Sequence, residues 1–390
     1  MIAKNREERF RSVLLLVVLV VVLAPLIRYW FAASGWTDFL AFYNAGRMVA
    51  EEQAAFLYEQ AVLSRRGAPH FLYAPLYAAF FLPLGLLSFE AARALWGILG
   101  MGALALSVVI SRRWSLIPLH VGLLVVALFF PTYVALLLGQ TSPLTLLLFA
   151  AVAALVWRRG GGGVAGVAAG LTLFKPQLIL PLLLVWLWRR ERRALVGMAL
   201  AAMFLLLGSL LVSPSATLSF PSAHDEIGDV VMGAVVQRQI NPTLYTVAGP
   251  AIALAGMAAA LAALLYTWRW SLRYYEGLHH LPGQALTGSR EPVSSPYHHA
   301  LLWLAPFVIT PYLGTYDLLL LLLPLSFLAP ALRYDRLLRL AVALLWLNLT
   351  LFLLPAARSL APWSLLLLFA LCAWRANSAA PRPIARHSPA

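Results

Sequence analysis

Long apolar stretches separated by short polar segments run through almost the whole chain. The first extends from Val13 to Ile27, after Lys4, Arg6, Arg9 and Arg11, and later ones lie at 71–88, 91–111, 116–138, 143–157, 164–188, 194–213, 247–268, 299–313, 318–332, 340–356 and 360–374. About 20 residues are needed to cross roughly 30 Å of hydrocarbon, so the shorter stretches are expected to be tilted or re-entrant. The pattern predicts an all-α, polytopic integral membrane protein with about 11–12 transmembrane helices.

Composition supports this fold class and argues against a soluble protein and against a nucleic-acid-binding role. The 390-residue chain is 62% hydrophobic and only 11% charged, which excludes an ordinary soluble protein. Its 29 basic and 15 acidic residues give a net charge of +14. The arginines stand in short clusters between apolar stretches, as topology determinants do, so a nucleic-acid partner is not expected. The single cysteine, Cys372, excludes an internal disulfide.

The basic clusters predict which segments face the cytoplasm. The positive-inside rule places the N-terminus there, together with Arg112/Arg113, Arg158/Arg159, Arg189/Arg190/Arg192/Arg193, Arg269/Arg273 and Arg333/Arg336/Arg339. This arrangement needs 71–88 to be re-entrant or shallow, and 164–188 to form a bent hairpin turning at Lys175-Pro176, where proline breaks the helix. The alternative, one straight helix over 164–188, would move the Arg189 cluster to the outer face.

The first apolar stretch has two interpretations. It could be a signal peptide, with Ala32, Ala33 and Ser34 as the small residues of a cleavage site. The interfacial aromatic residues Tyr29, Trp30 and Phe31 favour a retained first helix. With that helix retained, the outer face carries two substantial loops, 32–70 and 214–246, and the first is expected to carry short juxtamembrane helices.

The first outer loop holds the densest polar cluster, which begins at Ser34 and ends at Arg47. Asp38 lies close to the end of a membrane helix, where a carboxylate is costly to desolvate unless it is paired or wet, and this favours a functional role. The alternative is that Asp38 caps the short amphipathic helix that follows. Sequence spacing leaves both open.

Four further polar residues each have a functional and a structural interpretation. Lys175 in an apolar segment suggests an anionic partner on the same face, either a lipid phosphate or Asp38, although a snorkelling lysine is the alternative. Arg47 could bind the same phosphate with its planar fork or pair with Glu51 one turn later. Gln140 could bind a sugar hydroxyl or tie helices together. Asp317 could assist the site or cap the helix that it opens.

The histidines do not form a predicted metal site. His279/His280 and His298/His299 are adjacent pairs, and neighbouring helical residues point in different directions. His70, just before a tyrosine-rich segment, could touch a phosphate, but a lone interfacial histidine is more often incidental. Walker-type, dinucleotide and His-Glu-x-x-His motifs are absent from the sequence, which argues against nucleotide-sugar chemistry on the cytoplasmic side and against zinc proteolysis.

Several ordered motifs resemble those of one membrane-enzyme family. Asp38-Phe39 with Tyr43, Ala45, Gly46, Arg47 and Leu57-Tyr58 resembles the first-loop signature of glycosyltransferase family 87, a part of the GT-C superfamily. Tyr73-Ala-Pro75-Leu76, Pro83-Leu84 and Trp96 are similar to its following segment. Gly139-Gln140, Gly166, Gly170-Leu171 and Lys175-Pro176 are similar to its central motifs, and Pro311-Tyr312 with Tyr316-Asp317 resembles a late motif. The matches cover roughly residues 36–320 in order.

The resemblance implies a multi-span transferase that uses a polyprenyl-phosphate sugar, typically mannose, outside the cytoplasm, needs no cofactor, and acts on a lipid or glycan acceptor. It implies Asp38 as the base. The phosphate-binding residues would be Lys175, Arg47 and His70, and the substrate-binding residues Tyr43, Tyr73, Gln140, Tyr312 and Asp317. Members acting on lipid mannosides tend to carry a late outer histidine where this chain has Tyr312, Tyr316 and Asp317, so the sugar and acceptor stay open.

The resemblance also suggests a domain organisation. Residues 1–246 would form the GT-C-like catalytic module of an inner-membrane protein, 247–375 would add transmembrane helices, and 376–390 would be a disordered cytoplasmic tail. One carboxylate plus nearby cations suffices for an inverting displacement, because a phosphate leaving group needs no general acid. A transporter or lipid-linked glycan flippase is the rival class, although its polar residues would be expected at the membrane midplane.

Overall fold

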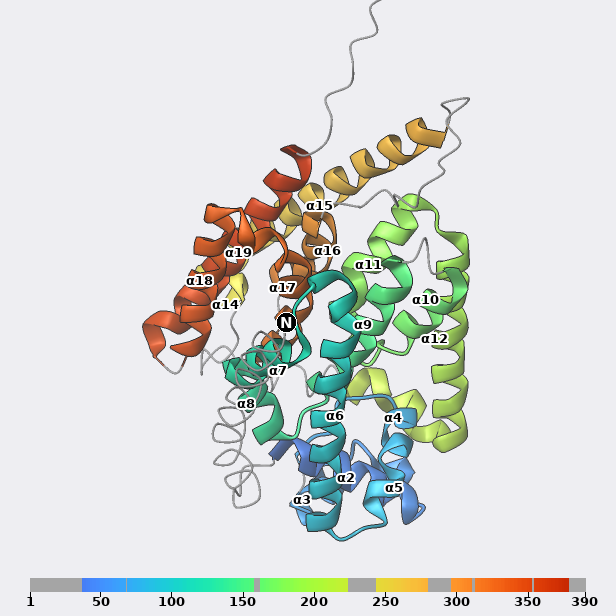
Figure 1. Ribbon diagram of the computed structural model, residues 1–390. Coiled ribbons are helices and arrows are strands. Elements are labelled where there is room, and N and C mark those ends of the chain that lie inside the picture. Colours follow the sequence, from blue (N-terminus) through green and yellow to red (C-terminus); the bar gives the residue numbers. More distant parts are fainter. Residues whose placement is uncertain are drawn as a thin grey trace, which may run out of the picture.

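The computed structural model describes residues 37–67, 69–157, 162–223, 243–279, 296–310, 313–352 and 354–378. All regular secondary structure in these ranges is helical, which confirms the predicted all-α class (Figure 1). The first apolar stretch, most of the loop at 214–246, the C-terminal tail and the candidate residue Tyr312 lie outside the described residues.

The chain begins its described part with short helices and continues with longer ones. The short ones are α2 (Thr37–Ala50), the 3₁₀ helix η1 (Ala54–Phe56), α3 (Gln60–Arg65), α4 (Pro75–Phe80) and α5 (Leu82–Gly85). The next group is α6 (Phe89–Ser115), α7 (Leu119–Leu128), α8 (Phe130–Leu138), α9 (Ser142–Trp157), α10 (Gly162–Gly170), α11 (Pro176–Arg189) and α12 (Arg192–Val212). The last group is α14 (Leu244–Ala248), α15 (Pro250–His279), α16 (Pro296–Ile309), η2 (Thr315–Leu321), α17 (Leu322–Leu328), η3 (Ala331–Arg333), α18 (Arg336–Thr350) and α19 (Pro355–Ser378).

The predicted short helices of the first outer loop are present, and they pack around their own aromatic core. Phe42 stacks on Phe81 at 4.8 Å between ring centroids, and Phe81 lies 5.0 Å from Trp96 of α6. Helices α2 and α5 cross in backbone contact, because a Cβ on Gly46 would overlap the carbonyl of Phe81. The expected shallow segment 71–88 is divided into α4 and α5, each far too short to cross a bilayer.

Only some of the apolar stretches in the described residues form long helices. In the described residues four helices are long and apolar enough to cross a membrane: α6, α12, Pro250–Trp268 of α15 and Ser359–Ser378 of α19. The pair α7 and α8, bent by 70°, would make a fifth. Other apolar stretches form shorter helices, such as α9 and α11, and α16 is buried over nearly its whole length. Hydropathy alone does not distinguish lipid-facing residues from residues buried between helices, so the number of spans stays a prediction.

The predicted break at Lys175-Pro176 is confirmed, and the chain reverses there. Helix α10 runs parallel to α12, since Gly163 lies beside Arg193 and Gly170 beside Ala201. Helix α11 ends at Arg189, just before α12 begins, so its end lies beside the start of α10. Residues 164–188 therefore form a hairpin, and Lys175 lies at its turn.

The hairpin gives the bundle two chemically different ends (Figure 1). At one end, here called the outer-loop end, α2–α5 lie beside the turns at 139–142 and 171–175. At the other, the arginine end, Trp114 bonds Ser326, Arg189 lies over Trp268, and Asp335 bonds Arg375. The clusters Arg112/Arg113, Arg189–Arg193 and Arg333–Arg339 belong to this second end. These three arginine clusters are thus separated from Asp38, Gln140 and Lys175 by the length of the bundle.

Candidate active site

The turn between α8 and α9 presents three consecutive polar side chains inside an apolar bundle. Gly139 ends α8 in the left-handed conformation, at φ 65°, which glycine adopts without steric cost. The Trp96 indole donates to its carbonyl at 2.8 Å and fixes the turn. The Thr141 carbonyl then accepts the first hydrogen bond of α9, from the Thr145 N–H. Gln140, Thr141 and Ser142 are all buried as a result.

Asp38 and Gln140 meet across 102 positions of sequence. The Gln140 Nε2 donates to Asp38 Oδ2 at 2.5 Å. Asp38 is in the first turn of α2, where the helix dipole favours a negative charge. An ionised carboxylate only accepts hydrogen bonds, so the amide nitrogen must face it and the amide oxygen, Oε1, points away.

Lys175 is paired with Asp317, and neither side chain reaches solvent. Lys175 Nζ lies 2.6 Å from Asp317 Oδ1, and the residues are 5% and 1% exposed. The Ser142 hydroxyl donates to the same oxygen at 2.9 Å, and Nζ lies 4.9 Å above the Tyr316 ring. The predicted anionic partner of Lys175 was a phosphate or Asp38; the structure supplies Asp317. A snorkelling lysine is wrong for this position, because the ammonium group is buried.

The turn at 139–142 connects these two clusters. Gln140 contacts Asp38, and Ser142, two residues later, contacts Asp317 and Lys175. Tyr73 approaches from the other side, since its ring lies 6.0 Å from Phe174, the neighbour of Lys175. Tyr77 also contacts Phe174 and bonds the Leu171 carbonyl at 3.4 Å. The first loop therefore packs directly on the hairpin turn that carries Lys175.

Two buried polar atoms of the turn have no hydrogen-bond partner among the described residues, Gln140 Oε1 and Thr141 Oγ1. Thr141 occupies the N-cap position of α9, where a threonine hydroxyl ordinarily accepts a backbone N–H, yet it makes no such bond. Each unsatisfied buried group costs about 1–3 kcal/mol. Their position between the Asp38–Gln140 and Lys175–Asp317 clusters makes them candidates for a ligand's hydroxyl groups.

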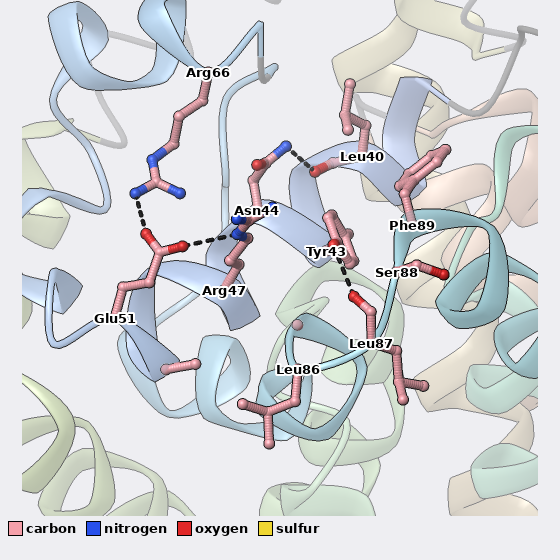
Figure 2. Close-up of a pocket in the computed structure, with 12 residues that line it drawn as sticks. Leu40, Tyr43, Asn44, Arg47, Glu51, Arg66, Leu86, Leu87, Ser88 and Phe89 are labelled. Atoms are coloured by element: carbon pink, nitrogen blue, oxygen red, sulfur yellow. Dashed lines mark hydrogen bonds and ion pairs between the residues drawn. The ribbon is translucent and has the colours of Figure 1, made fainter.

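Arg47 and Tyr43 are not part of this cluster. They line a separate pocket on α2 (Figure 2). Arg47 follows Asp38 by nine residues, which places it about 180° around the helix and about 13 Å along it. Arg47 donates to Glu51 at 2.7 Å, the predicted surface pair, and the Tyr43 hydroxyl donates to the Leu87 carbonyl at 2.9 Å. Hydrogen bonds from Arg66 and Arg47 lower the pKa of Glu51 below its usual value.

A family model described as Glycosyltransferase family 87 matches residues 71–278, more than half of the chain. The chain belongs to glycosyltransferase family 87. It is therefore a membrane glycosyltransferase, with a sugar donor, an acceptor and membrane lipids as its partners. No curated protein and no solved structure matches it.

The family 87 match covers Tyr73, Gln140 and Lys175, whereas Asp38 and Asp317 lie outside the matched residues. The structure nevertheless joins each of these acids to a residue within it. Ser142 and Tyr316 contact the Lys175–Asp317 pair, and Thr141 lies between the clusters. Of these three, sequence reasoning assigned no role to Thr141 or Ser142, although the polar run Gln-Thr-Ser inside an apolar segment was a signal for both.

The histidines of this family 87 member differ in position, since His70 precedes Tyr73 by three residues and His299 lies at the arginine end. His70 is partly buried, and its Nδ1 has no hydrogen-bond partner within the described part of the chain. His299 stacks on Phe327 at 5.1 Å, at the arginine end. No group of three or more His, Cys, Asp or Glu side chains in the described ranges is arranged to hold a metal ion.

Proposed function

We propose that this protein transfers a hexose, mannose in the first instance, from a polyprenyl-phosphate donor to a lipid or glycan acceptor, with inversion at the anomeric carbon. The observation that carries the proposal is the pair of clusters joined by the turn at 139–142. One cluster offers a carboxylate, Asp38. The other offers a buried cation, Lys175. A base and a cation held together by one rigid turn suit the transfer of a sugar from a phosphate.

Asp38 acts as the general base. It takes the proton of the acceptor hydroxyl as that oxygen forms its bond to the anomeric carbon, and the carbon–oxygen bond to the phosphate breaks on the opposite side. Gln140 orients the carboxylate through the Nε2 bond. Asp317 serves as the counterion of Lys175, since both Lys175 and Ser142 donate to its Oδ1. An inverting displacement needs only one reacting carboxylate, which is Asp38.

Lys175 stabilises the leaving phosphate. In the absence of the sugar donor, Asp317 is the counterion of Lys175. The buried ammonium group is therefore always paired, and the cost of a buried unpaired charge is avoided. The phosphate approaches Lys175 from the side not occupied by Asp317, and charge developing on the leaving oxygen is neutralised there. His70 and the aromatic ring of Tyr73 would contact the donor near the hairpin turn, and Tyr312 would contact the substrate from the segment before Asp317.

The unsatisfied atoms Gln140 Oε1 and Thr141 Oγ1 bind hydroxyl groups of the sugar. A hydroxyl donates to the amide oxygen, and the threonine hydroxyl either donates or accepts. Burial makes these bonds selective. A sugar epimer that cannot form one of them leaves a buried polar atom of the site unsatisfied, and its binding is weakened by the free energy of that bond.

The site faces the extracytoplasmic side of the inner membrane. This follows from placing the arginine end in the cytoplasm by the positive-inside rule. The clusters Arg112/Arg113, Arg189–Arg193 and Arg333–Arg339 support that orientation, since they gather at the end opposite Asp38. A charged base near the outer boundary can reach an acceptor that has already left the cytoplasm.

The decisive experiment gives the purified protein polyprenyl-phosphate-mannose and a panel of lipid and glycan acceptors, and detects the product by mass. We expect a glycosylated acceptor with inverted configuration. Asp38→Asn should lose activity by about 10²–10⁴-fold, the usual contribution of a general base, with no change in thermal unfolding. The matched control is Glu59→Gln, which neutralises an exposed acid of the same loop.

Full activity of Asp38→Asn would refute the assignment of the base. If the wild-type protein in proteoliposomes moves the labelled lipid across the membrane and forms no product, the protein is a flippase and the proposal fails.

A further inference from the structure

The pocket beside α2 is a second polar site, distinct from the cluster at Asp38. Its volume is about 680 Å³, and its walls are α2, the connection from Leu86 to Phe89, and Arg66 just after α3 (Figure 2). Tyr43, Asn44 and Arg47 enter it from the face of α2 opposite Asp38. A ligand bound here would lie across a helix from the proposed base.

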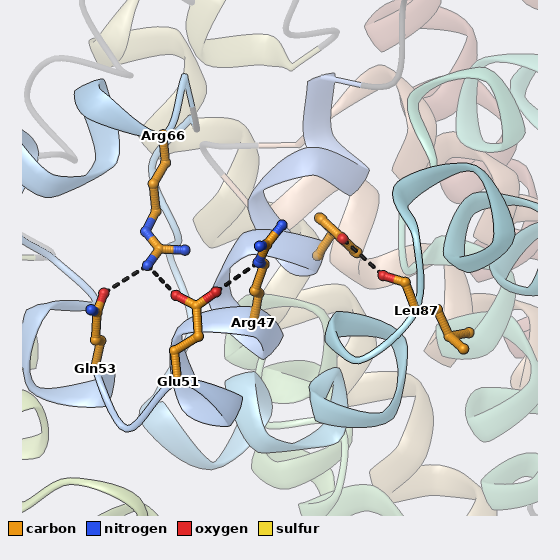
Figure 3. Close-up of polar contacts among 6 residues, drawn as sticks. Arg47, Glu51, Gln53, Arg66 and Leu87 are labelled. Carbon is orange, nitrogen blue, oxygen red and sulfur yellow. Dashed lines mark hydrogen bonds and ion pairs between the residues drawn. The ribbon is translucent and has the colours of Figure 1, made fainter.

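Charge in the pocket lining is positive. The charged residues of the lining are Arg47, Arg66 and Glu51. Glu51 accepts from Arg47 Nε at 2.7 Å and from Arg66 Nη2 at 2.5 Å, and Arg66 Nη2 also donates to Gln53 at 2.6 Å (Figure 3). One carboxylate thus holds two guanidinium groups in place. Because it neutralises only one of them, the lining keeps one net positive charge.

Arg47 is the better placed of the two for binding a ligand. Its side chain is 51% exposed, whereas that of Arg66 is 20% exposed. It contacts Glu51 through Nε, so the paired terminal nitrogens, Nη1 and Nη2, are not used by that carboxylate. A guanidinium fork of this kind matches two oxygens of a phosphate group.

The same pocket has an apolar wall. Leu86 and Leu87 line it and are 69% and 39% exposed, and Leu40 adds a third leucine from α2. Ser88, also in the lining, is the N-cap of α6, and α6 is one of the helices long and apolar enough to cross a membrane. The pocket therefore lies where a candidate span begins, which is the level of lipid head groups. Cations beside exposed leucines at this level suit an amphiphilic anion.

We propose that this pocket binds the phosphate head group of an anionic lipid, with Arg47 on the phosphate and Leu86 and Leu87 along the chain. The phosphate bound here is not the leaving group, because Arg47 lies on the far side of α2 from Asp38. Arg47 and Lys175 thus serve two different phosphates. The proposal stands independently of the glycosyl transfer, since it concerns binding alone.

The test measures binding by thermal shift on the full-length protein in a neutral detergent. Short-chain phosphatidylglycerol, phosphatidylcholine of the same chain length and inorganic phosphate are titrated in separate arms. We expect saturable stabilisation by phosphatidylglycerol, and at least tenfold weaker responses to the other two probes. Arg47→Gln should weaken phosphatidylglycerol binding about tenfold, as loss of a charge-assisted bond does. The matched control, Arg65→Gln, removes an exposed arginine next to Arg66 that is outside the pocket lining.

A variant that is expected to strengthen binding distinguishes a binding effect from a folding defect. Glu51→Gln removes the carboxylate that competes for both arginines, so it should strengthen phosphatidylglycerol binding several-fold. Equal binding by wild type, Arg47→Gln and Arg65→Gln would overturn the proposal. So would inorganic phosphate binding as tightly as the lipid, because the apolar wall would then contribute nothing.

Discussion

Two buried aspartates, Asp317 and Asp335, pair with cations at opposite ends of the bundle, and their surroundings differ. At the arginine end, Asp335 Oδ1 accepts from the Leu338 N–H at 3.1 Å and from Arg375 Nη2 at 3.1 Å. Its Oδ2 accepts from the Tyr297 hydroxyl at 2.9 Å and from Arg375 Nε at 2.8 Å. At the outer-loop end, Lys175 and Ser142 both donate to one oxygen of Asp317, Oδ1.

The difference fits a structural junction at Asp335 and the ligand site proposed at Asp317. Asp335 caps α18 and links α16 to α19, so both oxygens are used by the fold itself. Among the described residues, buried atoms with no hydrogen-bond partner occur at both ends: Gln140 Oε1 and Thr141 Oγ1 lie in the turn beside the Asp317 cluster, and His298 Nδ1 follows Tyr297 at the arginine end. Native proteins rarely leave such atoms unsatisfied without a reason. The number of carboxylate oxygens that the fold engages, and the polar turn beside Asp317, support the substrate role proposed for the Lys175–Asp317 cluster.

The largest expected effect comes from removing Lys175. Lys175→Met leaves Asp317 buried and unpaired, which should cost about 3–5 kcal/mol of stability. It should also lower transfer by about 10²–10³-fold, the usual cost of losing one group that stabilises developing negative charge. Thermal unfolding and product formation measure the two losses separately.

The double variant Lys175→Met/Asp317→Leu should separate the two losses. An apolar pair of similar volume generally replaces a buried ion pair without loss of stability, so unfolding should return close to wild type. Transfer should stay lost, because the cation is still missing. The control is Asp335→Asn, which should destabilise the protein while the folded fraction keeps its specific activity. Recovery of transfer in the double variant would show that the pair is structural, like Asp335.

A smaller effect compares two threonines one turn apart. Thr145 donates to the Thr141 carbonyl at 3.0 Å, whereas the Thr141 hydroxyl has no partner in the described ranges. Thr145→Val should lower the free energy of unfolding by about 1 kcal/mol, the value of an ordinary hydrogen bond. The sugar donor should still stabilise this variant as it does the wild type. Thr141→Val removes an unsatisfied polar atom, so the free protein should be as stable or up to about 1–3 kcal/mol more stable.

Donor binding then decides between the two interpretations of Thr141. The apparent affinity of Thr141→Val for polyprenyl-phosphate-mannose, measured from thermal stabilisation, should be about tenfold weaker than that of wild type, as expected for one lost hydrogen bond to a sugar. An unchanged response to the donor, together with reduced stability of the free protein, would mean that Thr141 serves the fold alone.

Sequence patterns predicted much of the fold and only part of the site. The apolar stretches predicted the all-α class, and Pro176 predicted the reversal after Lys175. The count of about 11–12 spans stays a prediction: four or five helices of the described residues are long and apolar enough to cross a membrane, whereas the apolar helix α16 is shorter and buried between other helices. Pairings such as Asp38 with Gln140 and Lys175 with Asp317 depend on tertiary contacts across more than a hundred residues, and no local pattern encodes them.

Thr141 shows a second reason for incomplete prediction. In apolar helical segments threonine commonly satisfies its hydroxyl on a backbone carbonyl one turn earlier, as Thr145 does. That habit makes a threonine uninformative until its actual partner is known. Arg47 shows the converse, because its pairing with Glu51 follows from the four-residue spacing, and its position opposite Asp38 follows from the nine-residue spacing along one continuous helix, α2.

The smallest effect concerns the exposed counterpart of these buried pairs, Glu51 with Arg66 and Arg47. Their hydrogen bonds lower the pKa of Glu51 in the folded protein. A lowered carboxyl pKa gives stability that is fully present above the unfolded value, 4.5, and is lost as pH falls through the folded value. Glu51 is about one-third exposed, so solvent screening limits the contribution to about 1 kcal/mol or less.

Acid titration of unfolding should therefore show a small loss of stability below about pH 4.5 in wild type that is absent from Glu51→Gln. The control, Glu52→Gln, changes the exposed neighbour and should keep the wild-type profile. High salt should reduce the difference, since exposed pairs are screened whereas the buried Lys175–Asp317 pair is not. A loss of several kcal/mol in the free energy of unfolding that does not depend on salt would instead show that the Glu51 pairs are shielded from solvent. Glu51 would then behave like the buried carboxylates, contrary to the comparison made here.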